Sequence, residues 1–302
     1  MTNRRSSCSI EKMVINRQRA LIRLIANEGG KMSKLRLVKL AFLLRNSAQA
    51  APKSSLYEFL PYHYGPYSFT LNYELHVMER DGWLRIADNE VELLRTAADQ
   101  LFKIERQFAF EIDALTRSYR DTSTSVLVSR VYREFPWYTA RAMDIGRRNA
   151  HIPIAQCAIF AVGYEGLMLD GLLNLLLQAG VKRLVDVRCN PVARRFGFHR
   201  STLERHCRDV GIAYLHVPQL GIPSVRRANL TDSQSYDRLF RYYEDTILPA
   251  NEESIRSLSG LVKREPSALM CMEADAKCCH RTRLAQAISK DTSLPVKELR
   301  LQ

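Results

Sequence analysis

The stretch CAIFAVGYEGLMLDGLLNLLLQAGVKRLVDVR, residues Cys157 to Arg188, holds two short apolar segments on either side of a longer one. The outer segments, Cys157–Gly163 and Arg183–Val187, have the length of buried strands, while Leu167–Gln178 has the length of a helix. Gly180 follows that helix at a position where glycine commonly ends one. A strand, a helix and a second strand of these lengths predict parallel pairing through a right-handed crossover.

The same alternation continues toward the C-terminus. Ser201 and Glu204 have the spacing of a capping box, which predicts a helix over Thr202–Val210. The remaining expected elements are the strand Ile212–Val217, helices near Ser235–Ile247 and Glu253–Lys263, the strand Ala268–Met272, the helix Arg281–Ser289 and the strand Val296–Leu301. We therefore expect residues 156–302 to form a Rossmann-like, mostly parallel α/β domain.

The first half of the chain has a different pattern. Apolar residues recur at helical spacing over Lys31–Ala48, and Gly65-Pro66 then breaks an aromatic, extended stretch. Ser68 is suited to cap a helix over Phe69–Glu79. The other expected elements are a short hairpin over residues 83–86 and 90–93 and helices over 96–115 and 123–134. This order predicts a helical, winged-helix-like domain over residues 1–145, followed by a polar, Arg-rich linker.

This half resembles the winged-helix, antitoxin-like domain of the Panacea type. The resemblance spans residues 15–140 and is carried by Lys34-Leu35-x-Leu37-x-Lys39-Leu40, Tyr64-Gly65-Pro66-Tyr67-Ser68, Asp81-Gly82-Trp83-Leu84 and Val131-Tyr132-x-x-x-Pro136. Such domains occur in toxin–antitoxin and phage-defence proteins, so the resemblance implies a nucleic-acid-binding or interaction role.

The chain carries a large positive charge. Its 302 residues include 45 Lys and Arg against 32 Asp and Glu, a formal net charge of +13. This surplus favours a polyanionic partner, and we expect nucleic acid, DNA in particular. No segment approaches the roughly 18 consecutive apolar residues of a membrane span, and the first residues lack the apolar core of a signal peptide. The seven cysteines are scattered rather than arranged as a disulfide framework, so we expect a reducing cytoplasm.

Polar side chains accompany the ends of four expected strands. Ligands bind beyond the carboxyl ends of the strands in an open parallel sheet, so these side chains should share one edge. They are Tyr164 and Glu165 after the first strand, Asp186, Arg188, Arg194 and Arg195 at the second, Tyr214 and His216 at the third, and Glu273 after the fourth. An ionised group is costly at the end of a buried strand, which singles out Glu273.

The motifs at these strand ends resemble the family called domain of unknown function 488. The matching segments are Gly163-Tyr164-Glu165-Gly166, Asp186-Val187-Arg188 with Pro191 and Arg194, Tyr214 to Gly221, and Cys271 and Glu273 followed by Cys279-His280-Arg281. The resemblance spans residues 157–290 and implies that the site lies on these residues, while the activity of the family is not established. Related sequences often have Ser before the arginine pair, where this chain has Ala193.

The expected catalytic residues are Glu273, Asp186, Tyr164 and Glu165. Neighbouring, desolvated carboxyl groups acquire different pKa values, so that one donates a proton while the other accepts one or attacks, as in glycosidic cleavage. Nucleoside deoxyribosyltransferase-like proteins, with Glu, Asp and Tyr at the ends of parallel strands, are an analogy. The alternatives are a structural salt bridge from Asp186 to Arg188 or Arg281, and core packing for Tyr164.

The expected substrate-binding residues are Arg188, Arg194, Arg195, Tyr214, Cys279, His280 and Arg281. Guanidinium groups match the oxygens of a phosphate. Arg281 also opens a helix, where free backbone N–H groups favour anions.

The cysteines near the last expected helix admit several interpretations. Cys271, Cys278, Cys279 and His280 include residue types that bind zinc, but no Cys-x-x-Cys pair exists, so we expect no metal and no cofactor. A reactive thiolate at Cys279 is an alternative. We favour a Cys279 that packs against the sheet, with His280 orienting Glu273.

These features predict a DNA-targeting enzyme that acts on nucleobases, a hydrolase that cleaves the N-glycosidic bond of modified bases in phage defence. The alternative is a non-enzymatic winged-helix DNA-binding regulator or antitoxin with a nucleotide-sensing C-terminal domain. A third option is thiol redox chemistry through Cys278 and Cys279. The sequence leaves the oligomeric state open, a homodimer included.

Overall fold

The computed structural model describes residues 15–300 except 194, 228–229 and 231. Its contacts divide the chain into two units. The first comprises the chain up to Tyr57 together with Leu71–Val131, and the second comprises Glu58–Thr70 together with the chain from Tyr132 onward. A short segment of the N-terminal half therefore belongs to the second unit. The expected domain limits, residues 1–145 and 156–302, stay a prediction.

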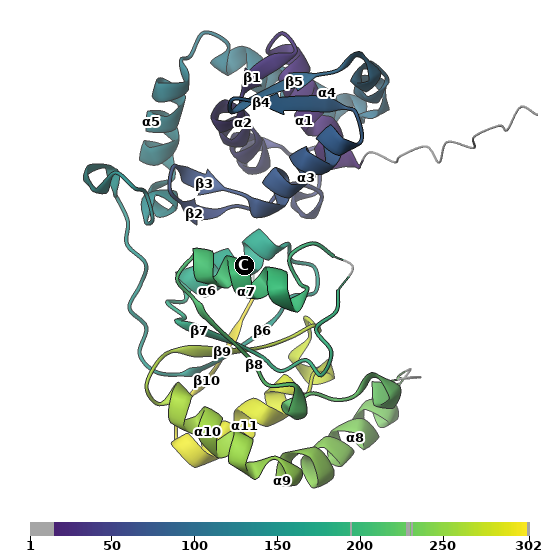
Figure 1. The fold of residues 1–302 in the computed structure, drawn as a ribbon, viewed down its shortest axis with the longest axis vertical. Helices are drawn as coiled ribbons and strands as arrows, with labels where there is room; N and C mark the ends of the chain where they lie inside the picture. Colours follow the sequence, from purple (N-terminus) through teal and green to yellow (C-terminus); the bar gives the residue numbers. More distant parts are fainter. Residues whose placement is uncertain (1–14, 194, 228–229, 231, 301–302) are drawn as a thin grey trace, which may run out of the picture. The chain divides into compact units, whose positions relative to one another are not determined.

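The first unit combines helices with a small antiparallel sheet (Figure 1). Its elements are α1 (Asn16–Asn27), β1 (Lys31–Ser33), α2 (Lys34–Ser47), most of α3 (Phe69–Arg80), β4 (Leu84–Ala87), β5 (Glu90–Leu93), α4 (Arg106–Tyr119) and most of α5 (Thr124–Glu134). The strand order is β1-β5-β4, and the hairpin predicted over residues 83–93 is β4–β5. The resemblance of this half to a Panacea-type domain stays a prediction.

One helix predicted in this unit is divided in the structure. Residues 96–115 were expected as a single helix, whereas Arg95–Lys103 forms 3-10 turns (η2) and α4 begins at Arg106. The side chain of Glu105 accepts hydrogen bonds from the backbone N–H groups of Gln107 and Phe108. This side-chain cap satisfies free amides at the start of α4 and so favours a new helix at that point.

The second unit is built on a parallel sheet. Its described strands are β6 (Ile159–Gly163), β7 (Arg183–Asp186), β8 (Ala213–His216), β9 (Ser267–Cys271) and β10 (Val296–Leu299), in the order β10-β6-β9-β7-β8. Each neighbouring pair is parallel, which confirms the predicted α/β class. The order departs from the 3-2-1-4-5 succession of dinucleotide-binding folds, because β9 lies between β6 and β7.

Helices cover both faces of this sheet (Figure 1). The elements α6 (Leu169–Gln178) and α7 (Arg200–Asp209) contribute to the core on one face. The other face is covered by α8 (Ser233–Tyr242), the π-helix η7 (Tyr243–Ile247), α9 (Leu248–Ala250), α10 (Glu252–Val262) and α11 (Arg281–Thr292). Among the described residues, every helix is too short or too polar to cross a bilayer.

The position of β9 determines where a ligand crevice forms. The chain leaves β6 and β7 toward the face of α6 and α7, but it leaves β9 toward the face of α11. Neighbouring strands whose chains leave toward opposite faces open a crevice at their carboxyl ends. This rule predicts a crevice at each border of β9, next to the residues that follow Cys271.

The segment from the N-terminal half joins the core on the α6 face. It forms the hairpin of β2 (Leu60–Tyr62) and β3 (Gly65–Tyr67), and Leu60 and Phe69 pack in the same cluster as α6. Asp170 accepts hydrogen bonds from the backbone N–H groups of Phe69 at 2.5 Å and Thr70 at 3.1 Å. Burial raises the pKa of Asp170 to about 6. The first amides of α3, for which Ser68 was the predicted cap, thus bind a carboxylate 100 residues away.

Candidate active site

Asp186, at the end of β7, is held by a network of hydrogen bonds. Its Oδ1 accepts from the backbone N–H of Arg188 at 3.1 Å and from Arg188 Nε at 2.8 Å. Its Oδ2 accepts from Arg188 Nη2 at 2.5 Å and from Tyr214 Oη at 2.7 Å. Asp186 is fully buried, and burial together with the charge of Asp186 raises the pKa of Tyr214 above its ordinary range. Among the described residues, two donors thus occupy each carboxylate oxygen.

This network is the structural salt bridge that the sequence left open as an alternative. Arg188 also donates to the carbonyl oxygen of Phe198 at 2.9 Å and to Tyr164 Oη at 3.2 Å. The ring of Tyr164 stacks on Phe198 with centroids 4.2 Å apart, and Tyr164 is buried. Because Asp186, Arg188, Tyr164 and Tyr214 bind one another, we interpret them as a brace that fixes the edge of the sheet.

Glu273 lies two residues beyond β9 and has different surroundings. The thiol of Cys271 donates to Glu273 Oε2 at 3.0 Å, and Arg227, at the end of the 3-10 turn η6 (Ser224–Arg227), pairs with the same carboxylate. Only 8% of Glu273 is exposed to solvent. The hydrogen bond between them shows that the side chains of Cys271 and Glu273 point toward one another. The loop after β9 therefore holds a carboxylate that the brace does not use.

Among the described residues, His280 hydrogen-bonds to groups other than Glu273, although it was expected to orient Glu273. Its Nδ1 lies 3.8 Å from Cys271 Sγ, and its Nε2 lies 3.2 Å from the carbonyl oxygen of Val187. In the described part of the chain, it is the thiol of Cys271 that orients Glu273. Cys279 is buried, as the favoured interpretation expected, and burial raises the pKa of its thiol.

Arg281, expected to bind phosphate, is fully buried. Its guanidinium group donates to the carbonyl oxygens of Glu273 and Ala274 and pairs with Glu298 of β10 at 2.5 Å. These partners are the protein's own acceptors, so the geometry gives Arg281 a structural role. It ties the loop after β9 to the edge strand β10.

Glu165, after β6, is exposed and anchored to the same loop. Its carboxylate accepts from the backbone N–H of Ala274 at 3.0 Å, and its own N–H donates to the carbonyl oxygen of Met272 at 2.8 Å. Gly163 allows this approach, because a Cβ atom there would lie 1.8 Å from the carbonyl oxygen of Glu273. An open cleft of about 660 Å³ lies beside Glu165; its lining includes Leu167, Asp275, Lys277 and Arg300.

The predicted residues thus form two groups at one sheet edge. The brace lies toward α6 and α7, while Cys271, Glu273, Cys279 and His280 lie toward α11. The contact of His280 with Val187 joins the two groups. Arg195 is exposed on the loop after β7, and Arg194 lies outside the described residues.

Three contributors were not among the expected catalytic or substrate-binding residues: Cys271, Arg227 and His216. Cys271 had a signal, because it stands two residues before Glu273 in the motif that resembles domain of unknown function 488. His216, which contacts the carbonyl oxygen of Arg188 at 2.9 Å, had its position at a strand end. Arg227 had only its charge, and its distance from Glu273 along the chain gave no indication of the pairing.

A parallel α/β domain with polar residues at its carboxyl edge is the class that this fold and site define. Residues 168–288 match the model of a family described as "Domain of unknown function DUF488". This match confirms the resemblance noted for the C-terminal half. No curated protein and no solved structure showed a significant match.

Proposed function

We propose that the second unit is a hydrolase that acts on the bases of DNA, cleaving the N-glycosidic bond of a modified base. The observation that carries this proposal is the carboxylate of Glu273, nearly excluded from solvent just beyond the carboxyl end of β9. A desolvated carboxyl group favours its protonated form, which suits a general acid. Arg227 opposes this tendency as a neighbouring cation, so substrate phosphate that draws Arg227 away would promote protonation.

The charge of the chain supports nucleic acid as the substrate. The net charge is +13, and exposed basic side chains lie on loops around the same edge of the sheet. They are Arg195 after β7, Arg226 before α8, Lys277 after β9 and Arg300 after β10. Positively charged side chains grouped around a crevice attract the phosphate backbone.

The proposed reaction uses two carboxylates: Glu273, in the loop after β9, and Glu165, which is hydrogen-bonded to that loop. The C1′–N bond breaks, Glu273 gives its proton to the departing base nitrogen, and the oxygen of a water molecule bonds to C1′. Glu165, exposed and held to Ala274, takes the proton of that water. A base inside a duplex must first be extruded, which costs a few kcal/mol and is cheaper for a modified or mismatched base.

The cellular setting is part of the same proposal. The resemblance of the first half to Panacea-type domains supports a role in phage defence, with that half contacting DNA. The described cysteines are free, which suits a reducing cytoplasm. Measurement of the protein's size in solution decides whether it forms a homodimer.

The test is base release from DNA by Glu273→Gln. The wild-type protein, incubated with plain and modified DNA, should release a free base that mass spectrometry detects. The variant should release it at least about 100-fold more slowly, because general acid catalysis contributes roughly 10²–10⁴-fold. Binding to the same DNA should be unchanged.

Glu253→Gln is the matched control, because Glu253 is an exposed glutamate at the start of α10. It should retain the wild-type rate. An unchanged rate in Glu273→Gln would remove Glu273 from the mechanism. Sequence-specific binding without any released base would instead favour the regulator with a nucleotide-sensing domain.

A further inference from the structure

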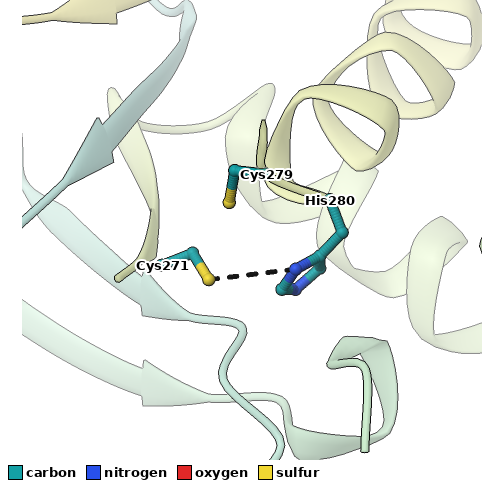
Figure 2. A group of neighbouring side chains, drawn as sticks. All are labelled: Cys271, Cys279 and His280. Atoms are coloured by element: carbon teal, nitrogen blue, oxygen red, sulfur yellow. Dashed lines mark hydrogen bonds between the residues drawn. The ribbon is translucent and has the colours of Figure 1, made fainter. Parts of the chain in front are cut away.

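We propose that Cys271, Cys279 and His280 bind a zinc ion, with the fourth coordination position directed toward Glu273. The three side chains come together at the end of β9 and the start of α11 (Figure 2). Their ligand atoms all lie within 4.8 Å of one another, and all three residues are buried. This inference stands without the proposed function, because it concerns binding of a metal and not base release.

The distance between the sulfur of Cys271 and the ring nitrogen of His280 is close to that of two ligands on one tetrahedral ion. Zinc lies about 2.3 Å from a cysteine sulfur and about 2.0–2.1 Å from a histidine nitrogen, so on one tetrahedral ion a sulfur and a nitrogen are about 3.6 Å apart and two sulfurs about 3.8 Å apart. The distance from Cys271 Sγ to His280 Nδ1 is 3.8 Å. Two thiolates and an imidazole are also a donor set that zinc prefers over harder cations such as Mg²⁺.

The tautomer of His280 is set for metal binding. Its Nε2 lies 3.2 Å from the carbonyl oxygen of Val187, which accepts a hydrogen bond and cannot donate one. In the neutral imidazole the proton is therefore on Nε2, and Nδ1 presents a lone pair toward the sulfur atoms. A histidine that binds a metal typically donates its other ring N–H to such an acceptor.

A buried tyrosine fixes the plane of this ring. Tyr243 packs edge-on against His280 with centroids 5.2 Å apart, and its Oη donates to the carbonyl oxygen of Leu220 at 2.8 Å. Tyr243 is the first residue of the π-helix η7, a local insertion that often occurs at functional sites. The ligand ring is thus held by packing and not only by its own hydrogen bonds.

Glu273 lies beside the fourth position. Its Oε2 is 3.0 Å from Cys271 Sγ, within the reach of a metal-bound water or of the metal itself. On binding, the thiols of Cys271 and Cys279 release their protons, including the proton that Cys271 donates to Glu273. The two thiolates then neutralise the charge of the buried Zn²⁺. Three protein ligands with one open position is the arrangement of catalytic zinc sites.

Cys278 provides an internal control one residue away. Its Sγ lies 4.0 Å from Asp275 Oδ2, and Cys278 is outside the cluster of ligand atoms. Two adjacent cysteines of the same chemistry therefore differ in placement. Substitution of Cys279, but not of Cys278, should therefore reduce zinc binding.

The first experiment measures the zinc content of protein purified without chelators. We expect about one zinc ion per chain in the wild type and in Cys278→Ser, and at least a tenfold loss in Cys279→Ser. Thermal unfolding of each variant checks that it is folded. Wild-type protein with less than about a tenth of an ion per chain, and no zinc uptake by the reduced protein on titration, would overturn the proposal.

The second experiment needs only the wild-type fold. Cobalt(II) added to the reduced, metal-free protein should produce a sulfur-to-cobalt charge-transfer band in the near ultraviolet and the visible bands of tetrahedral coordination. Excess zinc should remove both. A disulfide between Cys271 and Cys279 in protein kept under reducing conditions, or a cobalt spectrum without the sulfur band, would contradict the assignment.

Discussion

At the scale of single residues, Asp186 and Arg188 pair across two positions of the chain at the end of β7, a spacing that makes their contact foreseeable. Their roles depend on distant partners: Tyr214 and the carbonyl oxygen of Phe198 complete the network around this pair. For the same reason the thiol of Cys271, and not His280, was found to orient Glu273.

The brace predicts a large effect of Asp186→Asn on stability. The change leaves the buried guanidinium group of Arg188 without its counter-charge, so the free energy of unfolding should fall by about 3–5 kcal/mol. Tyr214→Phe removes one hydrogen bond to the same carboxylate and should cost roughly 1–3 kcal/mol. Urea unfolding measures both.

A different outcome would return Asp186 to the catalytic groups. If Asp186→Asn unfolds at the wild-type urea concentration but no longer releases base from DNA, the residue acts in the chemistry. If Tyr214→Phe lowers the free energy of unfolding and the rate of base release together, Asp186 has a structural role.

At the scale of elements, hydrophobic periodicity and turn residues located the strands of the second unit to within a few residues. They did not predict the strand order, because the place of β9 between β6 and β7 is decided by which apolar faces pack together and not by any local pattern. The divided helix at Glu105 and the cap supplied by Asp170 were missed for a related reason. Each depends on a side chain whose hydrogen bonds no periodicity encodes.

The buried carboxylate of Asp170, which binds the first amides of α3, predicts how stability depends on pH. Its pKa is raised to about 6 in the folded protein by burial, against 3.8 for an ordinary aspartate. Between about pH 4 and pH 6 the unfolded chain has lost this proton while the folded chain retains it, so stability decreases as pH rises. The loss attributable to Asp170 is about 3 kcal/mol, since one pKa unit corresponds to about 1.4 kcal/mol.

Asp170→Asn removes this titration. Urea unfolding should show that the wild type loses up to about 3 kcal/mol of stability relative to the variant between pH 4 and pH 7. Asp232 is a control of opposite sign, because the backbone hydrogen bond from Ser235 lowers its pKa. The effect of Asp232→Asn should appear above pH 4 and vanish in acid. A difference that is constant with pH for Asp170→Asn would contradict the assignment.

At the scale of the whole molecule, the charge of +13 predicts DNA binding that weakens steeply with salt. Each phosphate that the protein neutralises releases counterions, so the logarithm of the affinity falls against the logarithm of the salt concentration with a slope of about −0.9 per phosphate. Lys277→Ala should make this slope shallower by about one. Lys277 lies just before the start of α11, whereas Lys290 is exposed in the last turn of that helix. Lys290→Ala is therefore the control, and it should leave the slope unchanged.

Fluorescence anisotropy with labelled duplex DNA, over a series of salt concentrations, measures these slopes. An affinity that does not change with salt would contradict the polyanion hypothesis for the chain. A slope that changes equally in both variants would show that the charge acts diffusely and not at the carboxyl edge of the sheet.

The segment Glu58–Thr70 has a consequence for how the protein is made. Its hairpin leaves the ribosome early, but the carboxylate that binds the amides of Phe69 and Thr70 is translated 100 residues later. At roughly 5–20 residues per second, those amides and the aromatic side chains around them wait on the order of 5–20 seconds for their partners. The nascent chain therefore carries this hairpin without its partners for about a third of its synthesis, and a gene fragment starting after the linker would encode a second unit without it.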